Sequence, residues 1–214
     1  MKRYCAPSSV GGTLRAPASK SSMQRALVCA ALAEGRSELS NPSYCADAAA
    51  ALGIVEALGA VCVRGERLLS VQGGILAPSS ALARAGGGAG EPPFRLSCGE
   101  SGLLMRMFAP IAALSPGAVE LLGEGSLASR PVSMIEGPLA ALGVSCATNG
   151  GLPPVRLRGP LAGGRATVDA SSSSQFLTGL LMALPLAAKD SVLDVPRIVS
   201  SGYIDLTMET MRAF

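Results

Sequence analysis

The sequence repeats itself, and this internal repeat constrains the fold more than any other feature. Residues 56–73 and residues 140–159 each read as the end of a helix, a glycine, a strand, a turn and a second strand. Gly59 and Gly143 occupy matching places, where a left-handed backbone commonly closes a helix. The chain is therefore expected to contain several copies of one supersecondary unit.

A second set of matching segments lies upstream of these. Residues 30–39 and 112–121 resemble each other, and residues 184–193 form a weaker third copy of a helix end, a short turn and a strand. The whole unit thus reads strand, helix, strand, helix, strand, strand, repeated about three times. The third copy stops after a helix predicted over 203–214, so we expect a truncated third unit and interpret the sequence as part of a longer protein.

Local signals place helices inside these units. Residues 21–33 carry apolar side chains at nearly helical spacing, and another apolar helix is predicted over 176–186. Asp47 precedes an alanine-rich run and is predicted to be the N-cap of the helix that follows. Residues 77–93, rich in Ala, Gly and Pro, are predicted to form a loop between two units.

Composition favours a folded domain with a core of small aliphatic side chains, because hydrophobic residues make up 49%, charged residues 15% and aromatic residues 3%. A net charge of +3 does not favour nucleic acid as a partner. The six cysteines are scattered and histidine is absent, so neither a metal site nor a cofactor is predicted. No signal peptide or membrane span is visible, and we expect a cytoplasmic protein without membrane contact.

Four short motifs could hold an anion. The first contains Lys20, Ser21 and Arg25, the second Gly102, the third Arg130 followed by Pro131, and the fourth the run Ser173, Ser174 and Gln175. The first, second and fourth lie at the entry to a helix, and a helix N-terminus offers free N–H groups to an anion. Taken alone, the first three motifs read more readily as an ordinary helix cap, a turn and a surface arginine, and the serine run, which leads directly into an apolar helix, reads less readily as a linker. Because those three stand at the same place in their units, packing around a pseudo-threefold axis would join them into one anion site.

The motifs also carry a family resemblance. The patterns PxSKSxxxR at 17–25, CGESGxxxR at 98–106, RP at 130–131, SSQF at 173–176 and YID at 203–205 resemble those of 5-enolpyruvylshikimate-3-phosphate synthases (3-phosphoshikimate 1-carboxyvinyltransferases), in the same order. The resemblance implies an inside-out α/β barrel built from βαβαββ units, in a protein of two similar domains. It assigns residues 14–214 to a shikimate-3-phosphate-binding domain, incomplete at its C-terminal end, and residues 1–13 to a strand or crossover segment of the second domain.

The resemblance further implies the reaction and the ligand contacts. The enolpyruvyl group of phosphoenolpyruvate would move to the 5-hydroxyl of shikimate-3-phosphate, in aromatic amino acid biosynthesis. Lys20, Gly102, Arg130 and Gln175 would contact phosphoenolpyruvate, with Lys20 also catalytic through its charge. Shikimate-3-phosphate would be contacted by Ser21, Arg25, Ser173, Ser174, Gln175, Ser200 and Tyr203. The family's acid and base groups lie in its second half, so this chain is expected to be inactive alone and to need that C-terminal domain as its partner, within a monomer.

Three positions depart from the family pattern, and two other functions stay open. Ala18 replaces a glycine, Glu100 an asparagine and Leu103 a threonine, which bears on affinity and on glyphosate sensitivity. The same fold occurs in UDP-N-acetylglucosamine enolpyruvyl transferases, although the SKS and SSQ motifs favour the shikimate enzyme. A non-catalytic anion-binding module would be the third possibility.

Overall fold

The computed structural model describes residues 3–14, 16–77, 80–84 and 92–214. The first unit alternates helices and strands after an extended N-terminal segment that carries no helix or strand at its described residues. Its strands form an antiparallel sheet in the order β1-β3-β2. The elements are α1 (Lys20–Leu32), β1 (Arg36–Ser40), α2 (Ala46–Ala57), β2 (Val61–Arg64) and β3 (Leu68–Gln72).

The middle unit has the full predicted pattern. Its sheet has the order β4-β5-β7-β6, with β4 and β5 parallel and the other pairs antiparallel. Its elements are β4 (Phe94–Ser97), α4 (Gly102–Ala112), β5 (Ala118–Leu122), the 3-10 turns η1 (Gly125–Ser129) and η2 (Ser133–Ile135), α5 (Glu136–Ala141), β6 (Ser145–Asn149) and β7 (Leu152–Arg158). The βαβαββ prediction is therefore confirmed here.

The third unit follows the same order as far as the sequence goes. The strands β8 and β9 are parallel, as are β4 and β5 in the middle unit. The unit comprises β8 (Arg165–Thr167), α6 (Gln175–Ala183), the 3-10 turn η3 (Leu184–Leu186), β9 (Val192–Asp194) and α7 (Ser201–Arg212). In the first unit, the described residues ahead of α1 form no strand, so that part of the predicted repeat is absent from the described chain.

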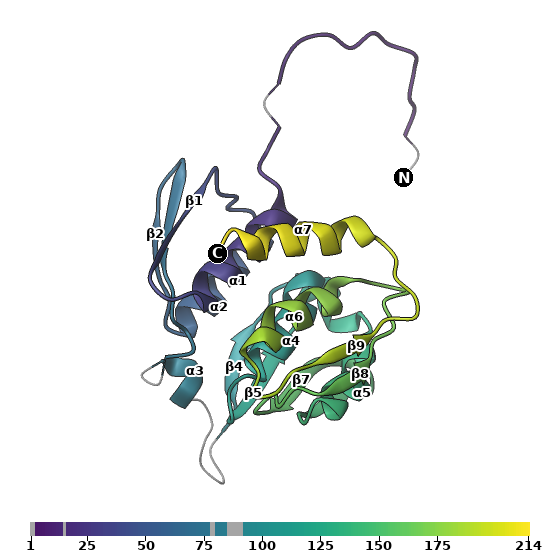
Figure 1. The fold of residues 1–214 in the computed structure, drawn as a ribbon. Coiled ribbons are helices and arrows are strands. Elements are labelled where there is room, and N and C mark those ends of the chain that lie inside the picture. Colours follow the sequence, from purple (N-terminus) through teal and green to yellow (C-terminus); the bar gives the residue numbers. More distant parts are fainter. Residues whose placement is uncertain (1–2, 15, 78–79, 85–91) are drawn as a thin grey trace.

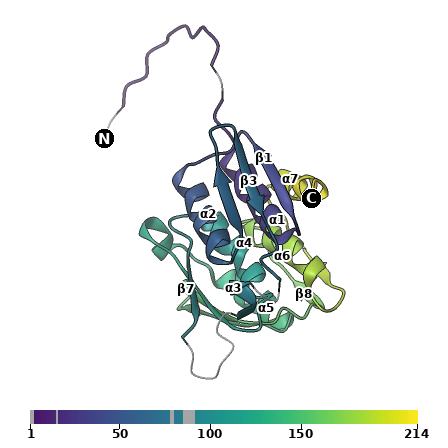
Figure 2. The ribbon, with the colours of Figure 1, turned by 90° about the vertical axis from the view of Figure 1, so that its left-hand side faces the viewer.

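Helices lie inside and sheets outside, which makes this an inside-out α/β arrangement. Figures 1 and 2 show the first sheet against α1 and α2, while the second and third sheets flank α4 and α6. Every residue of α4 is buried except Arg106. Gly179 lets α6 approach α4 closely, because a Cβ there would lie 2.3 Å from the carbonyl oxygen of Met107. The helices of different units thereby meet in one core.

Two of the predicted glycine positions are confirmed, and two local predictions are wrong in detail. Gly59 and Gly143 have φ angles of +110° and +88°, which suits glycine at a helix end. The helix α2 begins earlier than predicted: Cys45 is its N-cap, and Asp47 stands in its first turn. The predicted loop over 77–93 contains a short helix, α3 (Ala81–Arg84), while residues 78–79 and 85–91 lie outside the described ranges.

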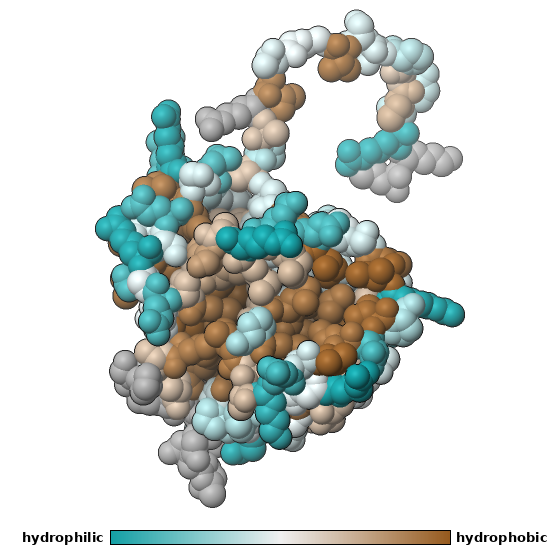
Figure 3. All heavy atoms as spheres, in the orientation of Figure 1, coloured by the Kyte–Doolittle hydropathy of each residue, from teal (hydrophilic) through white to brown (hydrophobic). Residues whose placement is uncertain are grey.

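One face of the molecule is apolar. Figure 3 shows hydrophobic side chains gathered on the surface between α7 and the third sheet. The exposed large apolar side chains of η3, of β9 and of the segment directly ahead of α7 belong to Leu186, Val192, Ile198 and Val199. Within the described ranges, no helix is long and apolar enough to cross a bilayer.

Candidate anion-binding site

The N-termini of α1, α4 and α6 meet at one cavity of about 250 Å³. The start of α7 closes a further side of it. The cavity is lined by Ser21, Arg25, Leu103, Ser172, Ser173, Ser174, Gln175, Ser200 and Tyr203. The predicted convergence of three helix starts, one from each unit, is confirmed by this geometry.

Arg25 forms the inner wall of the cavity and is almost fully buried, with 1% of its surface exposed. Its Nε donates to Thr207 Oγ1 at 2.9 Å, and its Nη1 donates to the carbonyl oxygen of Ser21 at 2.9 Å. Its Nη2 donates to Thr178 Oγ1 at 3.3 Å, and the Tyr203 ring centroid lies 5.5 Å from its Cζ. These partners are neutral, and burial lowers the pKa of the Arg25 guanidinium.

A buried arginine that lacks a carboxylate partner is costly. Among the described residues, no acidic side chain forms an ion pair with Arg25. Desolvation of an unpaired ion costs several kcal/mol. A buried, unpaired positive charge beside a polar cavity indicates that an anion is the missing partner.

The serine run at the start of α6 supplies neutral donors. Ser174 is the N-cap of α6, but its side chain accepts no hydrogen bond from a backbone N–H group of that helix. Ser173 Oγ accepts from the N–H of Gln175 at 3.2 Å. In α1 and α4, the N-caps Ser19 and Ser101 accept from the backbone N–H of the residue three positions on, a bond that Ser174 does not make in α6. The first turn of α6 is therefore the best placed of these helices to donate to an anion.

A second group of cations lies beside Gly102. A Cβ placed on Gly102 would lie 2.8 Å from Arg106 Nη1, 3.4 Å from Arg130 Nη1 and 3.9 Å from Gln175 Oε1. The bare backbone of Gly102 thus faces two guanidinium groups and an amide. We call this group, formed by Gly102, Arg106, Arg130 and Gln175, the arginine corner.

Lys20 lies at the edge of the site rather than inside the cavity. Its Nζ is 2.9 Å from Asp47 Oδ2, and its side chain is 55% exposed. The pKa of Lys20 is raised by its hydrogen bond with Asp47 and by the charge of that carboxylate. The positive charge of the nearby Arg130 offsets a small part of this rise. Lys20 therefore stays protonated at neutral pH, already paired with an acid.

Glu100, the acidic departure from the family pattern, turns toward the turn η1. Its Oε2 accepts from the N–H of Ser126 at 2.9 Å, and this bond lowers the pKa of Glu100. Glycine at position 125 suits this contact, since it has φ +49° and a Cβ would lie 2.4 Å from Glu100 Cδ, so that a larger residue would displace the Glu100 carboxylate. Arg130 Nη2 donates to Ser126 Oγ at 2.9 Å, so Glu100 and Arg130 share Ser126 without forming an ion pair.

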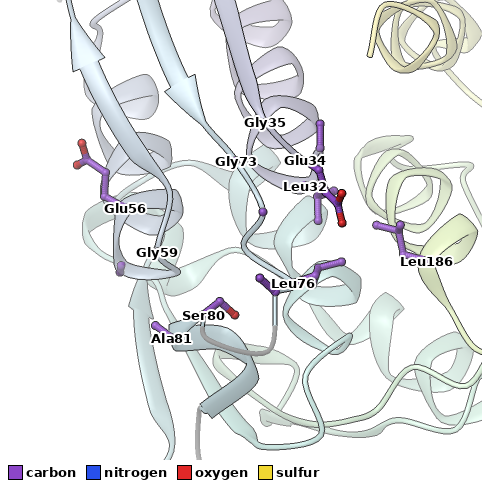
Figure 4. Close-up of a pocket in the computed structure, with 14 residues that line it drawn as sticks. Leu32, Glu34, Gly35, Glu56, Gly59, Gly73, Leu76, Ser80, Ala81 and Leu186 are labelled. Carbon is purple, nitrogen blue, oxygen red and sulfur yellow. The ribbon is translucent and has the colours of Figure 1, made fainter.

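A larger cavity lies elsewhere and suits anions poorly. It measures about 1070 Å³ and lies beside the C-terminal ends of α1 and α2, as Figure 4 shows. Glu34 and Glu56 line it together with Leu32, Leu186 and several glycines. Helix C-termini and carboxylates both repel negative charge, so the smaller cavity is the candidate anion site.

The sequence predicted most of the site but not its supports. Ser21, Arg25, Ser173, Ser174, Gln175, Ser200 and Tyr203 line the cavity, and Gly102 and Arg130 lie in the arginine corner. Arg130 is the C-cap of η1, and the next turn begins at Ser133. Thr178, Thr207 and Arg106 were missed as contributors. For these three residues the sequence offered one signal, because Arg106 is the arginine that ends the CGESGxxxR motif.

Comparison with known proteins agrees with this geometry. The family model described as EPSP synthase (3-phosphoshikimate 1-carboxyvinyltransferase) matches residues 5–214. A 3-phosphoshikimate 1-carboxyvinyltransferase of Methanoculleus marisnigri is 39% identical over 211 residues, covering 96% of this chain and 47% of that protein. One from Methanocorpusculum labreanum is 33% identical over 216 residues, covering 99% of this chain and 48% of that protein. An EPSP synthase structure from Acinetobacter baumannii has a TM-score of 0.76 at 25% identity, covering 95% of this chain and 43% of that one.

Buried helices, outer sheets and a polar cavity at the helix N-termini define the class of protein, an α/β protein of the enolpyruvyl transferase fold. Within that class, the chain belongs to the EPSP synthase (3-phosphoshikimate 1-carboxyvinyltransferase) family. The chain spans about half the length of the curated relatives it matches.

Proposed function

We propose that this chain is the shikimate-3-phosphate-binding half of a 3-phosphoshikimate 1-carboxyvinyltransferase. In that protein, residues 14–214 form the substrate-binding domain and residues 1–13 join the second domain. The complete protein transfers the enolpyruvyl group of phosphoenolpyruvate to the 5-hydroxyl of shikimate-3-phosphate. Phosphate leaves in the same reaction.

The observation that carries this proposal is the buried Arg25, which lacks an acidic partner in the described chain and stands beside serines at a helix N-terminus. The phosphate group of shikimate-3-phosphate supplies the missing negative charge. Ser173, Ser174 and the free N–H groups of α6 donate to its oxygens. Ser200 and Tyr203, on the opposite side of the cavity, contact the ring.

The arginine corner takes the second substrate. Phosphoenolpyruvate carries a carboxylate and a phosphate, and both need donors that bear positive charge. Arg130 and the amide of Gln175 flank the bare backbone of Gly102, where the ligand can approach closely. Lys20 leaves Asp47 to oppose the charge that develops on the reacting group.

Positioning and charge are what this half can provide. The resemblance places the proton-transferring carboxylates in the second half of the family's proteins, and the relatives found here are about twice as long as this chain. We therefore propose that substrate binding belongs to this chain and that turnover requires both halves. The C-terminal half is then its obligatory partner.

Calorimetry on residues 1–214 tests the proposal with four ligands: shikimate-3-phosphate, shikimate, inorganic phosphate and UDP-N-acetylglucosamine. We expect shikimate-3-phosphate to bind at least about 100-fold more tightly than shikimate, because only the former brings a charge to Arg25. Inorganic phosphate should compete with it. Equal affinity for shikimate and its phosphate would contradict the assignment, and tighter binding of UDP-N-acetylglucosamine would favour the other enolpyruvyl transferase. Binding of phosphate alone would indicate a non-catalytic anion-binding module.

A further inference from the structure

Arg106 ties three elements of the site together. From α4, its Nη1 donates to Gln175 Oε1 at 2.9 Å and to the carbonyl oxygen of Gly102 at 3.3 Å. Its Nη2 donates to the carbonyl oxygen of Pro131 at 2.7 Å. One guanidinium group thus joins the first turn of α4, the first turn of α6 and the segment that carries Arg130.

Arg106 occupies this place at a cost. Burial lowers its pKa, and the charge of Arg130 lowers it further. Its Nε is buried and makes no hydrogen bond, and no ion pair links it to an acid in the described part of the chain. A partly buried cation beside a second cation destabilises the unliganded site. A role in arranging its neighbours would account for its presence.

The bond to Gln175 fixes the orientation of that side-chain amide. A guanidinium can only donate, so the acceptor must be the amide oxygen of Gln175. The amide nitrogen is then turned away from Arg106. Gln175 lines the anion cavity, and among the described residues its Nε2 has no hydrogen-bond partner. Two N–H donors are therefore left for a ligand, and the oxygen that would repel an anion is occupied.

The hydrogen bond to Pro131 likewise occupies an acceptor oxygen, here beside Arg130, the second cation of the arginine corner. Pro131 directly follows Arg130, and its carbonyl oxygen is a lone-pair acceptor close to the arginine corner. While Arg106 holds that oxygen, it cannot face an incoming anion, and the backbone beside Arg130 is fixed. In both contacts, Arg106 occupies an acceptor oxygen close to the arginine corner.

We infer that Arg106 is a positioning residue, which holds the acceptor oxygens of Gln175 and Pro131 in hydrogen bonds so that they repel an anion in the arginine corner less strongly. The guanidinium adds positive potential there and needs no direct contact with the ligand. The identity of the anion, phosphoenolpyruvate, rests on the proposed function. The orientation of Gln175 does not, because it is set by contacts within the chain.

The first experiment therefore uses no ligand. Residues 1–214 are labelled with ¹⁵N, and the side-chain amide signals of Gln175 are assigned by their loss in Gln175→Glu. In Arg106→Gln we expect these signals to move toward those of a free glutamine and to exchange faster with water. Arg106→Lys keeps the charge but cannot reach Gln175 Oε1 and Pro131 O together, so it should shift the signals part of the way. Arg95→Gln, which removes an exposed arginine of β4, is the matched control and should leave them in place.

The second experiment measures affinity in the same variants. Loss of the fixed donors should weaken phosphoenolpyruvate binding roughly 10- to 100-fold in Arg106→Gln, with partial recovery in Arg106→Lys. Binding of shikimate-3-phosphate should weaken less than binding of phosphoenolpyruvate, because Arg25 and the serines of its cavity are unchanged although Gln175 lines that cavity too. Unchanged Gln175 signals in either folded variant would overturn the positioning role whatever the ligand; should Arg106→Gln not fold, Arg106→Lys decides it. Shifted signals in a chain that binds neither substrate would leave that role standing and overturn the proposed function instead.

Discussion

Replacing Arg25 by methionine separates binding from folding, because the two should respond differently. The side chain of Met has similar length and lacks charge, so it fills the space while removing the guanidinium. The change deletes three hydrogen bonds, to Thr207, Ser21 and Thr178. Hydrogen bonds to a charged group contribute about 1.5–3 kcal/mol each. Removing a buried unpaired ion relieves a penalty of several kcal/mol.

The two terms act against each other, so the free energy of unfolding without ligand should change by less than about 2 kcal/mol. Thr178 and Thr207 remain paired, since their hydroxyl oxygens lie 3.1 Å apart. The neighbours of Arg25 are therefore not left without partners. A large loss of stability is not expected in the unliganded variant.

Ligand binding should suffer far more. Two unit charges about 4 Å apart attract each other by roughly 4 kcal/mol at an effective dielectric constant of about 20. Allowing for competition from water, we expect a loss of about 2–4 kcal/mol, which is roughly a 30- to 1,000-fold weaker affinity for shikimate-3-phosphate.

Thermal unfolding with and without the ligand measures both quantities. At a concentration of about 100 times Kd, the wild type gains about 2.7 kcal/mol, a rise in Tm of roughly 5–10 °C. A variant with 100-fold weaker affinity gains only about 0.4 kcal/mol, a rise of roughly 1 °C. Arg36→Met, which removes an exposed arginine paired with Glu38, should keep the full rise. The reasoning is refuted if Arg25→Met keeps most of the ligand-induced rise.

Three further predictions concern the fold and its ionisable groups. Gly179→Ala should destabilise the protein by more than about 2 kcal/mol in urea unfolding, because its Cβ would lie 2.3 Å from a carbonyl oxygen of α4. Gly53→Ala, with open space around it in α2, should instead stabilise by about 0.5–1 kcal/mol; equal effects would disprove the packing argument. At pH 8, iodoacetamide followed by mass spectrometry should modify the exposed Cys45 well before Cys29, because burial raises the pKa of Cys29 to about 11; similar rates would contradict this. The hydrogen bond from Arg95 lowers the pKa of the Glu120 carboxyl group. The stability that the Glu120 carboxylate contributes is therefore complete above its unfolded pKa of about 4.3, and it is lost as pH falls through its folded pKa. The Tm of Glu120→Gln should therefore differ from that of the wild type at pH 7 and converge with it in acid. A Tm difference that does not change with pH would argue against the ion pair between Glu120 and Arg95.

The repeat made much of the fold predictable. Gly59 and Gly143 marked equivalent helix ends, because few residues besides glycine tolerate a positive φ there. Helix boundaries came within a few residues, since apolar spacing defines a buried face but not the residue at which hydrogen bonding begins. Asp47 was assigned to a cap because its residue type suits one. Its contact with Lys20 is tertiary, and no local pattern contains it.

The site was predictable where its residues stand at helix starts. Equivalent positions in the repeated units pointed to Lys20, Gly102 and Ser173 together. Arg106 lies inside a helix, and although it ends the CGESGxxxR motif, the motif does not say which groups its side chain contacts. Its function depends on acceptors from two distant segments, and spacing along the chain carries no information on these.

The helix α7 is held in an unusual way, and this has a consequence for its dynamics. Only Thr207 of this helix is buried, and it sits in the polar cluster of Arg25 and Thr178 that lies beneath the anion cavity. The apolar side chains of Ile204 and Met211 in α7 are only partly buried against the core, and a helix with few buried apolar contacts opens more readily than a fully buried one. The backbone amides of α7 should therefore exchange with deuterium faster than those of α4. Filling the cavity should slow that exchange, so α7 can report occupancy from a distance of several turns.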